Sequence, residues 1–436
     1  MPAAPSLLIV PYRSKTGKLY SQIPTSGAGD FTVTRNTEAR RFNSAGLIES
    51  VASGIPRLDY YTSGGTAGCP ALLVEPSATN GILNSADTRT SWVCWSGLTS
   101  GAIDVIGVSG TNLTVAVSGS NIGAGAGVGN LSRSSNNVAL ASGSTYTISF
   151  LLKKTGSHTI GGYFASITGA GAGDLAAGFD VSGSFSSGSF FTSNFTTNRI
   201  RRVEQWGTDV FRCSETFTMS ASGTLTTFRV GPVSGVTSAN NPAVGGIGFA
   251  APQIELGLIP TSFIPTTAAS GSRSADVISV SGAVSGSIGQ TEGTIYAEVD
   301  ITTKTASLNG NQLIDISFDA DTRMFFRRQD GSTLFQVRLR VGGVNVVDKQ
   351  LINIPAGVAK IALGYKSGDN AIYVNGTNVL TGAGLTNTFT IVNQFNKVDL
   401  GHLSGTANSQ FNDRIRAAAL YTTRLTNAEL QSLTTL

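Results

Sequence analysis

Closely spaced carboxylates are the residues of this chain that could most readily do chemistry. Glu298 and Asp300 are separated by one residue, so on a strand they would share one face. A retaining glycosidase uses two carboxyl groups about 5 to 5.5 Å apart as acid and nucleophile. A second acidic stretch, with Asp315, Asp319 and Asp321, could offer oxygens to a hard cation, but Ca²⁺ takes about six to eight ligands and the stretch lacks the regular spacing of a calcium loop. We interpret the pair as a solvated strand face and the stretch as a solvated loop.

Nucleophiles and metal ligands are sparse in the rest of the sequence. The two histidines, His158 and His402, are far apart, and no Ser-His-Asp arrangement is recognisable. The three cysteines, Cys69, Cys94 and Cys213, lack zinc-ligand spacing. Phosphate-binding loops and dinucleotide fingerprints are also missing from the sequence. We therefore predict a protein that is not an enzyme and that needs no cofactor, metal or disulfide.

Aromatic side chains are the candidates for sugar contact, because β-sandwiches commonly bind sugars on exposed aromatic faces. Four residues are predicted to contact a glycan: Tyr163, Trp95, Phe190 and Phe191. The two phenylalanines stand among Ser and Gly and are the best exposed candidates. Trp206 lies on an expected strand, and we predict that it packs in a core. Trp92 is expected to pack where the middle domain begins.

Composition limits the partners of this 436-residue chain. Charged residues are 13% of it, against about 25% in an average soluble protein, and the formal net charge is only +4. So weak a field predicts no nucleic-acid partner. Two arginine clusters, Arg199/Arg201/Arg202 and Arg327/Arg328/Arg338/Arg340, are interpreted as solvated strand faces, with contact to phosphates or acidic glycans as the alternative. No apolar stretch has the length of a membrane span, so we expect no membrane insertion and synthesis in a cytoplasm.

Alternating polar and apolar residues predict strands over most of the chain. Residues 145–152 and 225–230 alternate in the middle of the chain, between turns rich in Gly and Ser. Residues 294–302 place four apolar side chains on one face, and the dipeptides at 330–331, 342–343 and 375–376 are typical of tight hairpins. These patterns predict β-sandwiches.

One short helix is predicted near the carboxyl terminus. Thr426 and Glu429 have the spacing of a capping box, which satisfies backbone donors at a helix start. We expect a helix over residues 427–433 that lays Leu430 and Leu433 on the last sandwich.

Several runs of sequence carry a family resemblance. Residues 34–49, 56–60 and 71–76, followed later by 251–257 and 260–267, resemble the frame of structural proteins on tailed-bacteriophage virions, including fibres, adhesins and surface decorations. The middle of the chain, through residues 146–154, 202–206, 210–213 and 247–255, resembles carbohydrate-binding-module-like jelly rolls. The last part, through residues 360–376 and 415–430, resembles the laminin-G or concanavalin A-like jelly roll.

This resemblance implies an all-β protein with two antiparallel β-sandwich domains after an extended N-terminal segment. The expected boundaries are 1–79 for virion attachment or oligomerisation, 80–276 for the first sandwich and 277–436 for the second. Charged residues of the N-terminal segment are expected to pair across hairpins or with a neighbouring chain, or else to be solvated; they are Arg35, Arg40, Arg41, Arg57, Asp59 and Glu75.

Three functions remain open at this point. The resemblance implies a head or tail fibre on the virion surface, a homo-oligomer and by family a trimer, that holds other virion proteins and binds host polysaccharide. The first alternative is a capsid decoration or tail component that binds no sugar. The second is a polysaccharide depolymerase, for which Glu298 and Asp300 resemble the pair of laminarinase-type hydrolases. Those enzymes carry a second catalytic Glu three residues after the Asp, where this chain has Thr303.

Overall fold

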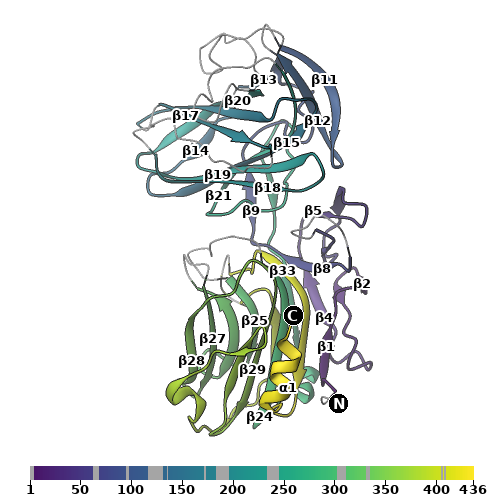
Figure 1. Cartoon of the computed structure of the whole chain (residues 1–436), viewed down its shortest axis with the longest axis vertical. Coiled ribbons are helices and arrows are strands. Elements are labelled where there is room, and N and C mark those ends of the chain that lie inside the picture. Colours follow the sequence, from purple (N-terminus) through teal and green to yellow (C-terminus); the bar gives the residue numbers. More distant parts are fainter. Residues whose placement is uncertain are drawn as a thin grey trace. The chain divides into compact units, whose positions relative to one another are not determined.

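The chain forms two compact β-sheet units in a computed structural model that describes residues 4–61, 68–94, 98–115, 131–134, 136–170, 173–182, 196–232, 245–301, 311–329, 334–403, 406 and 409–436. Residues 1–45, 50–77 and 274–436 make up one unit, here called the terminal unit. Residues 46–49 and 78–273 make up the other, here called the inserted unit. The strand ladders in both are antiparallel (Figure 1), which confirms the predicted all-β class with two sandwiches and a short C-terminal helix.

The terminal unit consists of two sheets. The first has the order β31-β30-β29-β24-β33-β8-β7, and β1 also pairs with β33. Its strands are β1 (Leu7–Ile9), β7 (Leu58–Asp59), β8 (Ala71–Val74), β24 (Glu292–Ile301), β29 (Gly357–Lys366), β30 (Ala371–Val374), β31 (Thr377–Asn378) and β33 (Asp413–Tyr421).

The second sheet of the terminal unit has the order β2-β3-β4-β23-β32-β25-β26-β27-β28. Its strands are β2 (Ser14–Lys15), β3 (Lys18–Leu19), β4 (Phe31–Thr34), β23 (Val277–Ser281), β25 (Asn311–Ser317), β26 (Arg323–Arg328), β27 (Phe335–Val341), β28 (Val344–Ile352) and β32 (Lys397–Leu400). Short 3-10 helices lie at η1 (Ala283–Ser287) and η2 (Gly382–Leu385), and β5 (Ala39–Phe42) pairs with β6 (Ile48–Val51).

The core of the terminal unit lies between these two sheets, as the alternating pattern predicts. Ile295, Ala297 and Val299 of β24 point into it and are buried. Tyr296 points the other way and packs under the C-terminal helix α1 (Asn427–Thr434) together with the buried Leu430. The capping box of Thr426 is present, so the predicted helix is confirmed.

Two of the predicted hairpin turns are confirmed by backbone geometry. Gly342 and Gly343 have φ of 55° and 83° between β27 and β28. Asn375 and Gly376 have φ of 47° and 80° between β30 and β31. Positive φ at both central positions matches the twist of two antiparallel strands. The third predicted turn, at 330–331, lies outside the described residues.

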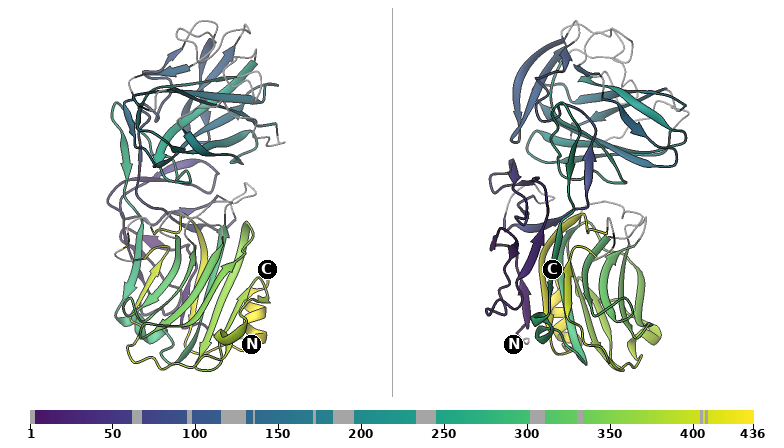
Figure 2. Two further views of the ribbon diagram at one scale, coloured as in Figure 1. Left: turned by 90° about the vertical axis from the view of Figure 1, so that its left-hand side faces the viewer. Right: turned by 180° about the vertical axis from the view of Figure 1, so that it is seen from behind.

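The N-terminal strands are part of the terminal unit, so the expectation that residues 1–79 form a separate segment is wrong, whereas the attachment role expected for them stays a prediction. β1 and β8 pair with β33, and β4 pairs with β23. Figure 2 shows these first strands running along the yellow β33. Their apolar residues, including Leu7 and Phe31, are buried in the core that the carboxyl-terminal strands form. Short strands of this kind gain stability only by joining a larger sheet.

The inserted unit is also a two-sheet sandwich. One sheet has the order β11-β12-β21-β15-β19-β18, and the other has the order β10-β13-β20-β16-β17 with β14 on β20. The strands are β10 (Val93–Cys94), β11 (Leu98–Val105), β12 (Val108–Val115), β13 (Leu131–Arg133), β14 (Val138–Leu140), β15 (Thr145–Lys154), β16 (Ile160–Thr168), β17 (Gly173–Asp180), β18 (Thr196–Gln205), β19 (Val210–Met219), β20 (Gly223–Pro232) and β21 (Gly245–Leu256).

The two ends of the inserted unit lie side by side. β9 (Ala78–Asn80) pairs with β22 (Gly271–Arg273), with Asn80 opposite Gly271. The chain therefore leaves for the inserted unit after residue 77 and returns at residue 274 next to its point of departure. Neighbouring ends are what the insertion of one domain into another requires.

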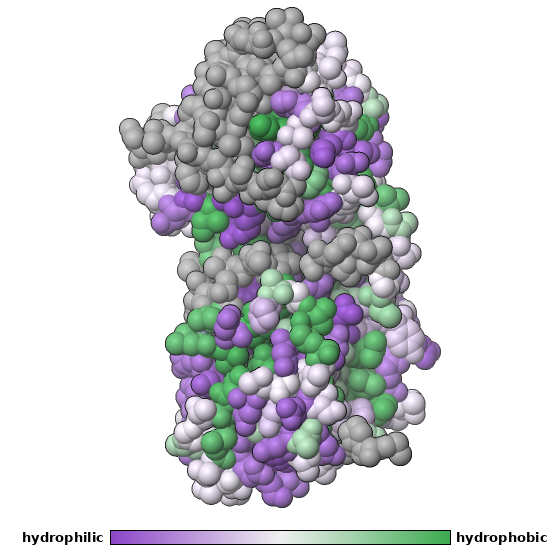
Figure 3. Space-filling model, in the orientation of Figure 1, coloured by the Kyte–Doolittle hydropathy of each residue, from purple (hydrophilic) through white to green (hydrophobic). Residues whose placement is uncertain are grey.

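The visible surface of the terminal unit is mixed in character. Hydrophilic and hydrophobic residues are interspersed over the described residues that Figure 3 shows there. The low charge content of the chain therefore does not leave that face uniformly apolar.

Candidate functional site

Three charged residues of the N-terminal motif, Arg35, Arg57 and Glu75, form a buried ion cluster with Asp276 in the terminal unit. Arg40 lies outside it and pairs with Glu38 nearer the surface. Arg57 bonds to Glu75 Oε2 through Nη1 at 2.5 Å and to Asp276 through Nη2. Arg35 Nη1 lies 3.0 Å from the other oxygen of Asp276. Burial by itself lowers the pKa of Arg57, but Asp276 and Glu75 outweigh it and the pKa is raised. The cluster is neither solvated nor open to another chain, so we assign it to the architecture rather than to ligand binding.

A second buried ion cluster continues this arrangement. Asp59 Oδ2 accepts a bond from Arg414 Nε at 2.7 Å, and the Arg414 guanidinium lies 4.5 Å from the centroid of the Tyr61 ring. Asp413 accepts a bond from Arg328 Nη2 at 3.1 Å. Buried arginines of this kind need such partners, because an unpaired buried charge is costly.

The candidate catalytic carboxylates are enclosed or ion-paired. Glu298 accepts bonds from Arg416 Nε at 2.8 Å and from the hydroxyl of Tyr296 at 3.2 Å. Asp300 is only 3% exposed, and its burial raises its pKa. The prediction of a solvated strand face is therefore wrong for Asp300. No group of three or more His, Cys, Asp or Glu among the described residues could hold a metal ion.

Another carboxylate pair, Asp315 and Asp399, was not predicted from the sequence. The two residues lie directly opposite each other on β25 and β32. Asp315 is bonded to Arg323, and the side chains of both aspartates are almost completely buried. Burial also raises the pKa of Asp315. Asp315 therefore does not belong to a solvated loop, which corrects the prediction, whereas the nearby Asp319 and Asp321 are exposed.

One predicted glycan-contacting residue falls inside the core, and the other three cannot be placed. Tyr163 is fully buried, its ring lies 5.5 Å from that of Phe228, and its hydroxyl bonds to Glu215 at 3.0 Å. It therefore has no exposed face for a sugar, and its selection was wrong. Trp95, Phe190 and Phe191 lie outside the described residues.

The first arginine cluster is mostly buried, unlike the predicted solvated strand face. Arg199 on β18 pairs with the buried Glu215 and donates Nη2 to the carbonyl oxygen of Ala176 at 3.0 Å. Arg201 donates Nη1 to the carbonyl oxygen of Gly178 at 3.2 Å. Both carbonyls belong to β17, the edge strand of the opposite sheet, so these arginines close one side of the sandwich.

Trp206 marks the best candidate binding site in the inserted unit. It lies just after β18 and is half-buried on the outer side of its sheet, whereas Trp92 is buried in the core. The expectation that Trp206 packs in the core is therefore wrong, and that for Trp92 is confirmed. A hollow of about 210 Å³, including the open space at its mouth, is lined by Ser149, Phe150, Leu151, Trp206, Arg212, Ala251, Gln253 and Phe263. We call it the Trp206 hollow.

A β-bulge shapes the floor of the Trp206 hollow. Ser149 pairs with Gln253 and Leu151 pairs with Ala250, so Phe150 alone faces two residues of β21. Ala251 in the bulge has a φ of 52°, which is uncommon for a residue other than glycine. Bulges redirect side chains and often lie beside functional sites. The proline at 252 was the sequence signal for this irregularity, because proline inside a strand is typical of bulges.

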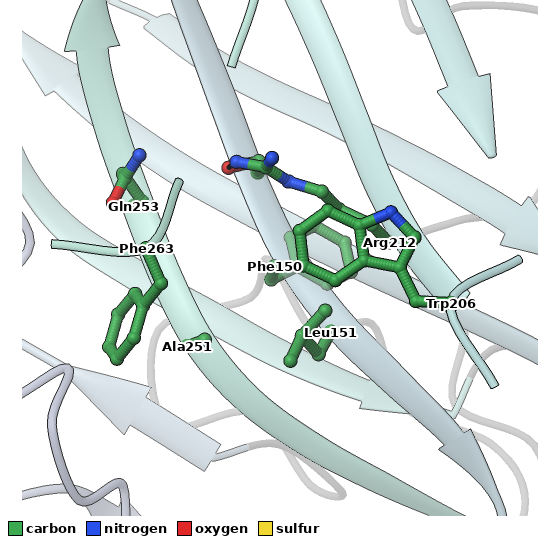
Figure 4. A pocket seen from close by; sticks show the side chains of 8 residues that line it. Phe150, Leu151, Trp206, Arg212, Ala251, Gln253 and Phe263 are labelled. Carbon is green, nitrogen blue, oxygen red and sulfur yellow. Dashed lines mark hydrogen bonds between the residues drawn. The ribbon is translucent and has the colours of Figure 1, made fainter. Parts of the chain in front are cut away.

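Polar groups in the Trp206 hollow are held in place. The guanidinium of Arg212 lies 4.8 Å from the Trp206 ring centroid, and its Nη2 donates to Ser149 Oγ at 3.2 Å and to the carbonyl oxygen of Thr261. Gln253 Oε1 accepts from the backbone N–H of Ile264 at 2.7 Å. Figure 4 shows Trp206 and Arg212 on one side and Gln253 with Phe263 on the other.

The segment after β21, which contains Thr261, is held in place by Glu255 of β21. Thr261 donates its backbone N–H and its hydroxyl to the two carboxylate oxygens of Glu255, at 2.8 and 2.7 Å. Glu255 is buried, which raises its pKa, although the Thr261 bonds act in the opposite direction. Thr261, whose carbonyl oxygen holds Arg212, is therefore itself held by β21, the strand next to the Trp206 hollow.

Comparisons with known proteins find distant structural likenesses. No family model matches the chain, and no curated protein matches it. The CBM40 of the Ruminococcus gnavus IT-sialidase is 19% identical over 34% of this chain and 85% of that chain, with a TM-score of 0.28. Domains LG4-5 of the mouse laminin alpha1 chain are 10% identical over 70% and 89%, with a TM-score of 0.23. Trypanosoma rangeli sialidase in complex with sialic acid is 12% identical over 96% and 60%, with a TM-score of 0.27.

These TM-scores are too low to assign a function to this chain, which must come from its own residues. Among the described residues, no helix is both long and apolar enough to cross a membrane.

Proposed function

We propose that the protein is a non-catalytic surface protein of a tailed-bacteriophage particle that binds host polysaccharide through the Trp206 hollow. The observation that carries the binding role is a half-buried indole beside a fixed guanidinium on the outer side of a sheet. Sugar rings have apolar C–H faces that pack on an indole, and their hydroxyls bond to guanidinium groups.

Preorganisation supports this role. Arg212 is tied to Ser149 and Thr261, and Gln253 is tied to Ile264, before any ligand arrives. Side chains that are already fixed lose less conformational entropy on binding. The hollow is shallow, and most of its lining other than Trp206 is almost completely buried. We therefore propose that it contacts the face of a single sugar unit with modest affinity.

Weak single sites are consistent with a multimer. We propose a homotrimer on the virion surface, assembled in the host cytoplasm, in which linked sites raise the overall affinity through effective concentration. The virion placement is supported by the resemblance of residues 34–49, 56–60 and 71–76. Because all of those residues except 46–49 belong to the terminal unit, we assign attachment to other virion proteins to that unit. Nucleic acid and membrane insertion have no part in this proposal.

A binding role without hydrolysis is supported by the state of the carboxylates. Glu298 is engaged by Arg416 and Tyr296, and Asp300 is enclosed. Asp315 and Asp399 are almost completely buried as well. A glycosidase acid and nucleophile must reach the scissile bond from both sides.

The test is binding of the purified protein to a panel of bacterial surface polysaccharides, with its oligomeric mass and the release of reducing ends measured in parallel. Trp206→Ala is expected to lower the affinity at least tenfold, or about 1.4 kcal/mol, because the stacking surface is lost. Trp206→Phe keeps an aromatic face and is expected to retain more binding.

The control is Tyr12→Ala, which removes an exposed aromatic ring from the terminal unit and should leave this binding unchanged. No binding by the wild-type multimer would favour a structural decoration instead. New reducing ends would show a depolymerase and would contradict the non-catalytic proposal.

A further inference from the structure

The second predicted arginine cluster lies on the outer face of the terminal unit's second sheet. Strand alternation sends Met324 and Phe326 of β26 into the core and Phe325 outward. Arg327, Arg338 and Arg340 share the outward side with Phe325, as does Arg323. Arg328 has the opposite parity and is buried in the ion cluster with Asp413, so it does not belong to this surface. We call the outward side of β25 to β28 the arginine face.

Three guanidiniums of the arginine face surround one aromatic ring. Those of Arg323, Arg327 and Arg338 lie 5.1, 5.4 and 5.4 Å from the centroid of Phe325. Strand pairing brings them together, because Phe325 is directly opposite Arg338 on β27. Cation–π attraction holds each guanidinium at the ring, although the three positive charges repel one another.

Carboxylates are interspersed with these arginines and only partly balance them. Asp315 pairs with Arg323, Asp348 pairs with Arg338 at 2.8 Å, and Asp321 pairs with Arg340 at 3.0 Å. Arg327 donates Nε to the amide oxygen of Gln336 at 2.8 Å. The face thus carries four arginines against three carboxylates.

Two arginines of this face are partly open to solvent. The side chains of Arg338 and Arg340 are 21% and 33% exposed. Their Nε atoms are buried, so a ligand would meet the outer ends of the two guanidiniums. An acceptor from a ligand could bond there while the arginines stay in place.

We propose that the arginine face binds a carboxylate-bearing polysaccharide, at a site separate from the Trp206 hollow and independent of the function proposed for it. A carboxylate matches the planar donors of a guanidinium. The hydroxyls of the same sugar donate to Asp348 or Asp321. Its ring packs against the guanidiniums that are stacked on Phe325. A nucleic acid fits less well, because its closely spaced phosphates would meet the interspersed aspartates.

The experiment measures binding of the full-length protein to polygalacturonate at low and at physiological salt. The matched ligand is the methyl ester of the same polymer, which keeps the backbone and removes the charge. Polygalacturonate is expected to bind at least tenfold more tightly than its ester, with an affinity that falls as salt rises. A double-stranded DNA fragment serves as the competing polyanion.

The variants are Arg327→Gln/Arg338→Gln and the single Arg340→Gln at the more exposed position. Both are expected to weaken polygalacturonate binding, the double variant by at least tenfold, while Arg89→Gln at an exposed pair of the inserted unit leaves it unchanged. If the double variant misfolds, the Arg340 variant and the ester comparison still decide the outcome. Equal binding of polymer and ester, undiminished binding by Arg340→Gln, or tighter binding to DNA would each overturn the proposal.

Discussion

The two units differ in the groups that join distant stretches of their chain. In the terminal unit the groups are charged: Arg57 and Asp276 are 219 positions apart, and Arg35 and Asp276 are 241 apart. In the inserted unit a neutral amide does this: Asn80 Nδ2 donates to the carbonyl oxygens of Pro252 and Ile264, which are 172 and 184 positions away. One unit is thus joined by buried ion pairs, whereas the other is joined by hydrogen bonds between neutral groups.

A discontinuous unit needs contacts that fix where its chain departs and where it returns. Asp276 lies just after the return from the inserted unit, and Glu75 lies just before the departure. Arg57 binds both, so the ion cluster fixes the two crossings of the chain relative to each other. Apolar contacts alone would tolerate a shift of a short strand, whereas a buried charge accepts only its own partner.

The largest effect is expected from breaking the ion cluster of the terminal unit. Arg57→Met leaves Glu75 and Asp276 without their shared cation and should destabilise that unit by about 3 to 5 kcal/mol. Calorimetry should show a lower melting temperature for the terminal unit and an unchanged transition for the inserted unit. Arg40→Met is the control, because Arg40 pairs with Glu38 near the surface and such pairs contribute at most about 1 kcal/mol.

A smaller effect is expected from the equivalent change in the inserted unit. Thr261→Val removes the hydroxyl that donates to Glu255 and accepts from Arg273 at 3.1 Å. Leaving these buried partners unsatisfied should cost about 1 to 3 kcal/mol. Only the transition of the inserted unit should move, while Thr99→Val at an exposed strand position should have little effect. A shift of both transitions would contradict the separation of the two units.

The smallest effect is a pH dependence confined to the terminal unit. His402 is buried, its Nε2–H donates to the carbonyl oxygen of Ile278, and it faces Asp399, with Lys397 nearby. Burial lowers its pKa below the ordinary 6.5, although Asp399 acts in the opposite direction. The unfolded chain therefore takes up the proton first. The stability that the neutral ring contributes is present above pH 6.5 and is lost as the pH falls through the folded-state pKa.

His402→Gln should remove this part of the pH dependence. Between pH 7 and pH 5 the slope for one such group is at most about 1.4 kcal/mol per pH unit. Melting temperatures of wild type and variant at several pH values provide the measurement. Parallel curves for the two proteins would show that His402 does not titrate in this way.

Local patterns made part of the fold predictable. The alternation in residues 294–302 gave β24 its correct inward face, and Thr426 with Glu429 gave α1. Both signals act over a few residues. The pairing of β1 with β33 joins Leu7 to Leu420, and no local pattern contains such a partner. The N-terminal segment was therefore expected to stand apart.

The candidate site was harder to predict for a similar reason. Trp206 follows the last residue of β18, so the alternation that would have assigned its face ends one residue earlier. Tyr163 has an aromatic ring of the kind that commonly contacts sugars, but the alternation of its strand points the ring inward, where its hydroxyl bonds to Glu215. The arginines of β26 and β27 were grouped by sequence, whereas strand parity separates Arg328 from Arg327.

The most direct test of this account compares full-length wild type, Trp206→Ala and Arg327→Gln/Arg338→Gln for binding to one panel of neutral and acidic polysaccharides. The first variant is expected to lose the host-polysaccharide binding of the inserted unit and to keep the binding of polygalacturonate. The second should lose polygalacturonate alone. Loss of all binding in either variant, or of none in both, would contradict the claim that the two units carry separate glycan sites.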